Sequence, residues 1–325
     1  MLSGSGMRQV HVLLVLLFAS SLLHAQPLRI GVSETILSLP LYVAEHEGFF
    51  KKHGVDVQLV KCVGGNRCMR NMLNGETELS TATELPVMFN SFERNDFAIL
   101  SSFVSTSTDV KILAKKSANV LRAADLQNKT VGYIEGTASQ YVLDLVLVYS
   151  GIDPSTVSLK AVTPEKALSA IASNEIEALC IWEPFAARIQ REFGAGVQLV
   201  PAPKLYTENF NLIALNSVIK ARPEELLKVL HALKDSTDFI ETHPDKAKSL
   251  LAKRFVLPRV IVDNIFGDYR YRLGLNRSLS RTMEGQARWA LREGYVNRTL
   301  SQPNYLNYLN SSLLRKVDPN LVSLP

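Results

Sequence analysis

Small hydroxyl residues, glycines and carboxylates follow the short apolar runs of this sequence, where a strand would give way to a helix. Hydroxyls and free backbone amides bind small polar anions and zwitterions, and glycine lets the backbone approach a ligand closely. We therefore predict a ligand-binding site in these segments. Its predicted residues are Ser33, Glu34, Thr35, Leu39, Gly64, Gly65, Asn66, Thr81, Thr83, Glu84, Gly136, Thr137, Ala138, Ser139, Trp182 and Glu183.

The Gly136–Ser139 segment is the strongest of these signals. Thr137 and Ser139 can present hydroxyls to a ligand, or they can cap the helix predicted over Ala138–Ser150. The pair Gly64-Gly65 is weaker, because a glycine pair between a strand and a helix is usually turn chemistry.

The aromatic and acidic members of the set bear on the kind of ligand. Trp182 can stack on an apolar part of a ligand or fill the core between two lobes. Unpaired carboxylates at Glu34, Glu84 and Glu183 would repel a bare inorganic anion, so they favour a ligand with an ammonium or a protonated ring nitrogen. Alternatively, each carboxylate points to solvent or pairs with Lys or Arg.

The sequence shows no spacing typical of a catalytic or metal centre. No Ser-His-Asp arrangement or glycosidase carboxylate pair is identifiable. His46 and His53 could share a helix face, but Gly48 interrupts it and no third ligand follows. We predict no catalytic residue, no metal and no cofactor.

The cysteines permit two interpretations. Cys62 and Cys68 span a short segment that a disulfide could close in an oxidising compartment, which would leave Cys180 as a buried thiol. Alternatively, both stay reduced and one packs in the core.

Strands alternate with helices over the first two thirds of the chain, which indicates βαβ units and parallel sheets. The predicted strands are Leu28–Val32, Val55–Val60, Thr77–Ala82, Phe97–Val104, Val110–Ala114, Thr130–Ile134, Val157–Val162, Ile176–Trp182, Val197–Val200 and Asn211–Leu215. The predicted helices between them are Leu41–Lys52, Arg67–Leu73, Pro86–Arg94, Ala138–Ser150, Pro164–Ser173 and Pro184–Phe193.

The remainder is predicted to be nearly all helical, with Tyr269–Arg272 covering a helical surface. Its predicted helices are Pro223–Ile240, Asp245–Phe255, Val260–Phe266 and Leu279–Gly294.

Length and composition fit a globular protein of two lobes. The 325 residues are 46% hydrophobic and 21% charged, and 36 basic against 31 acidic side chains give a net charge of +5. No stretch combines Lys and Arg density with interleaved aromatics, so nucleic acid is not an expected partner.

Residues 1–25 have the pattern of a secretory signal peptide. Arg8 precedes an apolar run, Val12–Ala19, that is too short to span a bilayer, and small residues precede Gln26. Cleavage after Ala25 would export the protein to the periplasm. The alternative is an uncleaved N-terminal anchor.

Three segments resemble the periplasmic solute-binding proteins of ABC importers, in the nitrate/sulfonate/taurine group that includes the NMT1/THI5-like proteins. PLYVAEHEGFFKKHGVDVQLV (Pro40–Val60) resembles the first helix and second strand of that family. ADLQNKTVGYIEGTASQYVLDLVLVYSGID (Ala124–Asp153) resembles the opening of its second lobe, and ALSAIASNEIEALCIWEPFAARI (Ala167–Ile189) a later unit. The resemblance extends from about Leu28 to Gly294.

The resemblance implies an α/β fold of the type II periplasmic-binding-protein kind, with two lobes and a hinged cleft between them. Residues 27–113 and 214–325 would form lobe 1, and residues 114–213 would form lobe 2. The implied partners are a small-molecule ligand and the ABC permease subunits of the inner membrane, and the implied state is a monomer. Such a receptor captures a sulfonate, a taurine-like zwitterion or a heteroaromatic precursor by closing.

Two alternatives remain in other functional classes. The pyrimidine synthase branch of the family uses a Lys and a His after the third strand and a Cys-rich run. This chain has Ala82, Thr83, Glu84 and Pro86 in the first region, and no Cys cluster near Leu212. A ligand-sensing receptor for a separate membrane signalling protein is the other alternative.

Overall fold

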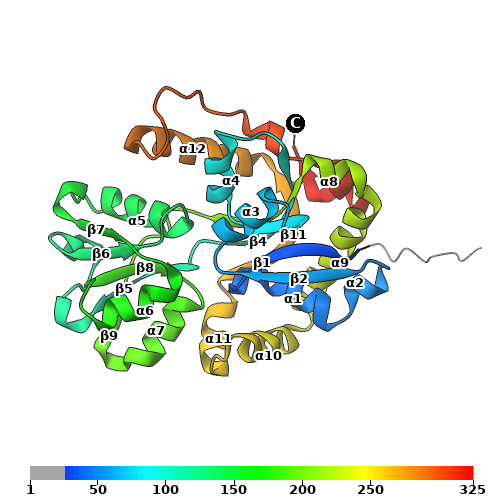
Figure 1. The fold of residues 1–325 in the computed structure, drawn as a ribbon. Coiled ribbons are helices and arrows are strands. Elements are labelled where there is room, and N and C mark those ends of the chain that lie inside the picture. Colours follow the sequence, from blue (N-terminus) through cyan, green and yellow to red (C-terminus); the bar gives the residue numbers. More distant parts are fainter. Residues whose placement is uncertain (1–25, 325) are drawn as a thin grey trace, which may run out of the picture.

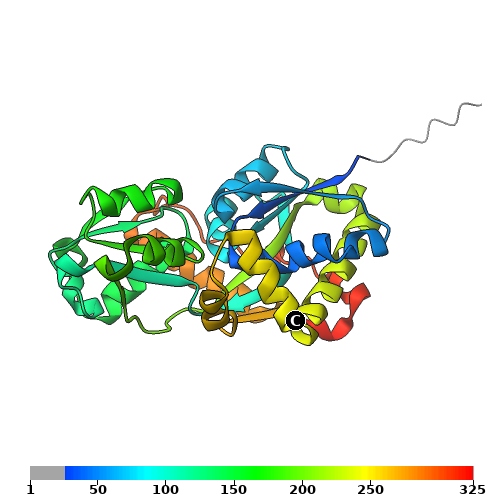
Figure 2. The same cartoon turned by 90° about the horizontal axis from the view of Figure 1, so that it is seen from below.

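Two α/β lobes lie side by side in the computed structural model, which describes residues 26–324 (Figures 1 and 2). The predicted signal peptide lies outside the described residues. Lobe 1 is built on a seven-stranded sheet and lobe 2 on a five-stranded sheet. No helix in the described residues is long and apolar enough to cross a membrane.

The lobe 1 sheet mixes parallel and antiparallel pairs. Its order is β12 (Val322–Ser323), β11 (Tyr269–Asn276), β4 (Phe97–Thr106), β10 (Glu208–Leu215), β3 (Leu79–Ala82), β1 (Leu28–Ser33) and β2 (Val57–Cys62). The strand β1 is parallel to both β2 and β3, whereas β10 is antiparallel to β3 and β4. Nearly every residue of β1, β3 and β4 is buried, as expected for strands covered on both faces.

Lobe 1 holds most of the helices. They are α1 (Leu39–His46), α2 (Phe49–Lys52), α3 (Gly65–Leu73), α4 (Glu84–Ser91), α8 (Asn216–Ala221), α9 (Pro223–Thr242), α10 (Pro244–Phe255), α11 (Arg259–Phe266), α12 (Arg277–Glu293) and α13 (Ser312–Val317). The long helix α9 buries Leu226, Val229, Leu230 and Leu233 in the core, at the spacing of one helix face.

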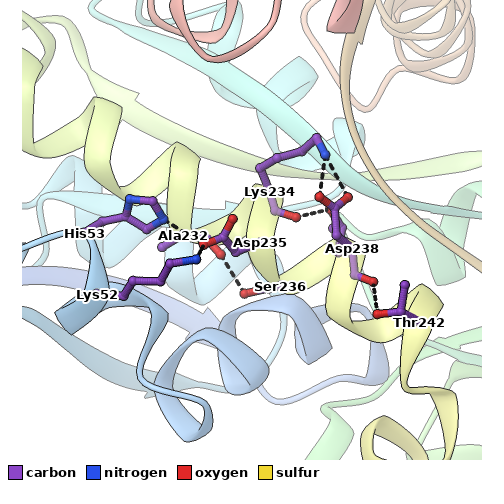
Figure 3. A network of polar contacts seen from close by, with 9 residues as sticks. Lys52, His53, Ala232, Lys234, Asp235, Ser236, Asp238 and Thr242 are labelled. Atoms are coloured by element: carbon purple, nitrogen blue, oxygen red, sulfur yellow. Dashed lines mark hydrogen bonds and ion pairs between the residues drawn. The ribbon is translucent and has the colours of Figure 1, made fainter.

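Polar contacts fix α2 on the outer part of α9. Asp235 accepts hydrogen bonds from Lys52 Nζ at 2.7 Å and from His53 Nε2 at 2.8 Å, and Figure 3 shows both side chains converging on it. His53 therefore has a structural partner. In the part of the chain that the structure describes, no group of three or more His, Cys, Asp or Glu residues could hold a metal ion.

Lobe 2 has the sheet order β7 (Ser158–Ala161), β6 (Thr130–Tyr133), β8 (Ala178–Trp182), β5 (Val110–Lys115) and β9 (Val197–Val200). Its helices are α5 (Ala138–Tyr149), α6 (Ala167–Ala172) and α7 (Phe185–Phe193). Two apolar clusters, one containing Leu143 and Val146 and the other Ile171 and Ile189, form its core.

The chain crosses between the lobes twice, through residues 107–109 and residues 201–207. These crossings lie a few residues before the expected boundaries at 113/114 and 213/214. The expected boundaries fall inside β5 and β10, because the apolar run of each strand continues to the crossing and pairs with its own lobe's sheet.

The prediction of a helical tail is wrong at Tyr269–Arg272. These residues begin β11, which is antiparallel to β4. In the sequence YRYRLGLN, buried Tyr269, Leu273 and Leu275 alternate with more exposed residues. This period of two is the signal of a half-buried strand.

Candidate ligand-binding site

A small cavity lies between the lobes and is lined from both of them. Its volume is about 30 Å³, which is the space of one or two water molecules. Its lining residues are Ser33, Thr35, Leu37, Gly65, Thr83, Pro86, Asp109, Thr137, Ala138, Trp182, Glu208 and Phe210.

The loop after β1 brings a hydroxyl to the cavity and to the other lobe. Thr35 Oγ1 accepts a hydrogen bond from the Leu37 amide at 3.4 Å and donates one to the Glu183 carbonyl of lobe 2 at 3.1 Å. Its neighbour Glu34 is partly exposed, with its carboxylate 3.9 Å from Lys61 Nζ. Leu39 is fully buried in the lobe 1 core and does not line the cavity.

The third-strand residues have different roles. Thr81 Oγ1 accepts a hydrogen bond from the Ser33 amide at 3.0 Å and donates one to the Gly31 carbonyl at 3.1 Å, so it holds the ends of β1 and β3 together. Thr83 lies one step further and lines the cavity.

The glycine loop before α3 packs closely on its surroundings. A Cβ on Gly64 would lie 3.6 Å from the Trp182 ring, and a Cβ on Gly65 would lie 2.9 Å from Ala82. Gly64 has a φ of 82°, in the left-handed region. Asn66 Nδ2 donates to the Glu135 carbonyl across the cleft at 3.5 Å.

A disulfide between Cys62 and Cys68 spans this glycine loop, with a Cα–Cα distance of 5.4 Å. It ties the end of β2 to the first turn of α3. Cys180 is a free thiol, and burial raises its pKa to about 12, so it stays protonated.

Both hydroxyls of the loop before α5 bond backbone groups of lobe 2. Ser139 Oγ donates to the Cys180 carbonyl at 2.7 Å and accepts from the Ile134 amide at 3.0 Å, which occupies it within lobe 2. Thr137 Oγ1 donates to the Ile134 carbonyl at 2.7 Å and accepts from the Ser139 amide, which caps α5, and the residue also lines the cavity beside Ala138. The Gly136 amide donates to a side chain within the helix, that of Gln140.

The predicted acidic residues Glu84 and Glu183 are bonded inside the protein. Glu84 accepts hydrogen bonds from Tyr206 Oη at 2.5 Å and from the amide and side chain of Asn209 at 2.8 and 2.6 Å. Burial raises its pKa to about 7. Glu183 accepts from the Ala187 amide at 2.9 Å, in the first turn of α7. Neither residue lines the cavity.

Two carboxylates that sequence reasoning missed line the cavity instead. Asp109 is the last residue of the first crossing, Glu208 is the first residue of β10 after the second crossing, and they are 1% and 3% exposed. Burial raises the pKa of Asp109 to about 8 and that of Glu208 well above its ordinary value. The available signal was an acidic residue one to three positions before the predicted strand that follows each crossing, and it can be used only once the crossings are placed correctly.

Further contacts join the lobes away from the cavity. The Arg67 guanidinium binds both carboxylate oxygens of Glu165, with Nη2 at 3.1 Å from one of them. Arg191 Nη1 of lobe 2 donates to the Val256 carbonyl at 2.7 Å. With the Thr35 contact, these pairs join lobe 1 to lobe 2.

Comparison with known proteins shows the family to which the chain belongs. The family described as NMT1/THI5 like matches residues 36–247, and the chain belongs to this family. It is 23% identical over 218 residues to a protein of Brucella abortus (strain 2308) named as a binding protein; the match covers 65% of this chain and 66% of that protein. It is 21% identical over 243 residues to a protein of Bacillus subtilis (strain 168) named as an aliphatic sulfonates-binding protein, covering 73% and 72% of the two chains.

Solved structures share the fold at low identity. The periplasmic aliphatic sulphonate binding protein SsuA from Escherichia coli matches with a TM-score of 0.74 and 17% identity, over 88% of this chain and 92% of its own. The periplasmic nitrate-binding protein NrtA from Synechocystis PCC 6803 matches with a TM-score of 0.74 and 15% identity, over 91% and 89%. The desulfurization enzyme DSZB matches with a TM-score of 0.67 and 15% identity, over 90% and 99%. The predicted family and the two-lobed periplasmic-binding-protein fold are thus confirmed.

Proposed function

We propose that this protein is the substrate-binding component of an ABC transporter, exported to the periplasm, where it captures a small organic solute and delivers it to a membrane permease. The observation that carries the proposal is the cavity between the lobes, since its lining comes from Ser33, Thr35 and Gly65 on one side and from Thr137 and Trp182 on the other. The solute is a sulfonate, a taurine-like zwitterion or a heteroaromatic precursor.

Binding would act through the position of the lobes. Contacts made by both lobes at once exist only in the closed form, so a solute that makes them shifts the hinge equilibrium toward closure, and the permease would recognise that form. The hydroxyl protons of Thr35 and Thr137 are donated to backbone carbonyls, so their oxygens would orient the solute as acceptors. Trp182 and Phe210 would cover its apolar part. This function requires no covalent step.

Thermal-shift screening of the mature protein tests the proposal. The screen holds taurine, alkyl sulfonates, nitrate, aromatic acids and pyrimidine precursors, and a solute that binds only the folded state raises the melting temperature. Thr137→Ala and Trp182→Ala should weaken the binding of any hit, whereas His46→Ala, on the exposed end of α1, should not. A hit whose affinity neither cavity variant changes would refute the site. Conversion of a hit into a product would instead favour an enzyme.

A further inference from the structure

The two chain crossings each deliver a buried carboxylate to the same cavity. Asp109 immediately precedes β5, and Glu208 is the first residue of β10. Both line the space between the lobes. Glu208 and Phe210 are two residues apart on a strand and so point to the same face, which agrees with Phe210 lining this cavity as well.

The protein leaves these carboxylates largely without donors. Asp109 accepts one hydrogen bond, from Tyr269 Oη to Oδ1 at 2.6 Å. Among residues 26–324, no hydrogen bond or ion pair reaches the Glu208 side chain. Glu84, by contrast, has three donors. Buried polar groups in native proteins nearly always have partners, so an unpartnered buried carboxylate at a ligand cavity points to a partner that the ligand supplies.

The Lys and Arg side chains of residues 26–324 do not supply that partner, since none of them lines this cavity. The ammonium group of Lys111 acts on Asp109 electrostatically, but it lies 3.7 Å from Asp268, with which it forms an ion pair. The described residues therefore bring two carboxyl groups and no cationic side chain to this cavity.

We infer that the solute carries a positively charged nitrogen, an ammonium or a protonated ring nitrogen, which lies between Asp109 and Glu208 when the lobes close. This inference rests on the proposed function and narrows its substrate class. A charge-assisted hydrogen bond to each carboxylate would satisfy both groups at once. Burial raises the pKa of both carboxyl groups, and a bound cation would favour their charged forms, whereas a solute whose only charge is negative would oppose them. Taurine meets the requirement through its ammonium group, whereas ethanesulfonate and nitrate do not.

Calorimetric titration of the mature protein with matched probes tests this inference. Taurine is paired with ethanesulfonate, which lacks only the amino group. Benzylammonium is paired with phenylmethanesulfonate, which has the same aromatic body for Trp182 and the opposite charge. We expect at least one ammonium-bearing probe to bind at least tenfold more tightly than its sulfonate-only counterpart.

Isosteric variants test whether Asp109 and Glu208 cause the tighter binding of the ammonium probe. Glu208→Gln and Asp109→Asn should each weaken the binding of the ammonium probe at least tenfold. Glu192→Gln, an exposed carboxylate on α7, is the matched control and should leave it unchanged. Melting temperatures of all three variants establish that they fold.

The outcomes separate this inference from the proposed function. Tighter binding of ethanesulfonate or phenylmethanesulfonate, unaffected by Glu208→Gln, would overturn the cationic assignment and leave the receptor function standing. Failure of both ammonium probes to bind would also overturn the assignment. The receptor function itself fails only if the thermal-shift screen finds no solute of any charge.

Discussion

The indole nitrogen of Trp289, on α12 of lobe 1, donates a 2.8 Å hydrogen bond to Asp144 Oδ2, on α5 of lobe 2. Figure 1 shows α12 lying along the upper side of α5. Tyr141, also on α5, packs edge-on against the same indole, with ring centroids 5.0 Å apart. The pair thus joins the lobes at a place distant in sequence from both crossings.

Removal of the Asp144 carboxylate, which accepts the hydrogen bond from Trp289, should favour opening of the two lobes. Asp144→Ala deletes one interlobe hydrogen bond, which contributes about 1 kcal/mol, or roughly a fivefold change in the ratio of closed to open molecules. Small-angle X-ray scattering should therefore give a larger radius of gyration than that of the unsubstituted protein. Asp153→Ala, an exposed aspartate elsewhere in lobe 2, should not change it. Equal radii for all three proteins would contradict a role of this pair in closure.

Three buried carboxyl groups should make the free energy of unfolding decrease as pH rises. Asp109, Glu84 and Glu208 have pKa values raised by burial, so the folded protein holds protons that the unfolded chain releases near pH 4. Their stabilising effect is complete below that pH and is lost as pH rises through about 7 to 8. The groups that act on Asp109 from neighbouring elements are Tyr269, Glu183, Lys111 and Asp268.

Denaturant melts between pH 5 and pH 8 measure this effect. The free energy of unfolding should decrease over that interval, and Glu208→Gln should make the decrease smaller. Glu192→Gln should follow the unsubstituted protein, because Glu192 is exposed. Parallel curves for all three would show that Glu208 does not bind its proton more tightly on folding.

Gly65 should not tolerate a side chain. A Cβ at this position would lie 2.9 Å from both Cα and Cβ of Ala82, and backbone of a central strand cannot move aside readily. Gly65→Ala should therefore lower the free energy of unfolding by about 1 to 3 kcal/mol in urea melts. Gly267→Ala is the control, since it has a φ of −68° and no neighbouring atom within 4 Å of its added Cβ. Its effect should be within about 0.5 kcal/mol of zero.

The disulfide should contribute measurable stability despite its short loop. A loop of this length loses about 2 kcal/mol of unfolded-state entropy when it is closed. Replacement of both Cys62 and Cys68 by Ala should lower the free energy of unfolding by about that amount. Dithiothreitol should destabilise the unsubstituted protein similarly and leave the double variant unchanged. If dithiothreitol also lowers the free energy of unfolding of the double variant, its effect does not come from this disulfide.

Much of the fold could be predicted because its signals are local. The alternation of short apolar runs with helical segments, and the positions of Gly136 and Thr137 before a helix, are readable along the chain. The sequence does not show which groups each hydroxyl bonds in the folded protein. Thr81, Ser139, Thr35 and Thr137 all bond backbone carbonyls and amides brought in by folding, but only Thr35 and Thr137 also line the cavity.

The partners of the acidic residues also depend on the fold and cannot be predicted from their positions after strands. Glu84 and Glu183 follow strands as ligand-binding residues would, yet Tyr206, Asn209 and the first turn of α7 bind them within the protein. Asp109 and Glu208 are 99 residues apart in sequence and come together only through the crossing geometry. Spacing along one chain carries no signal for that approach.

Asp109 is the last residue of the first chain crossing, and Glu208 directly follows the second. The two connections between the lobes therefore also carry the buried carboxyl groups of the cavity. A charge that a solute brings to these carboxyl groups would act directly on the places where one lobe is joined to the other.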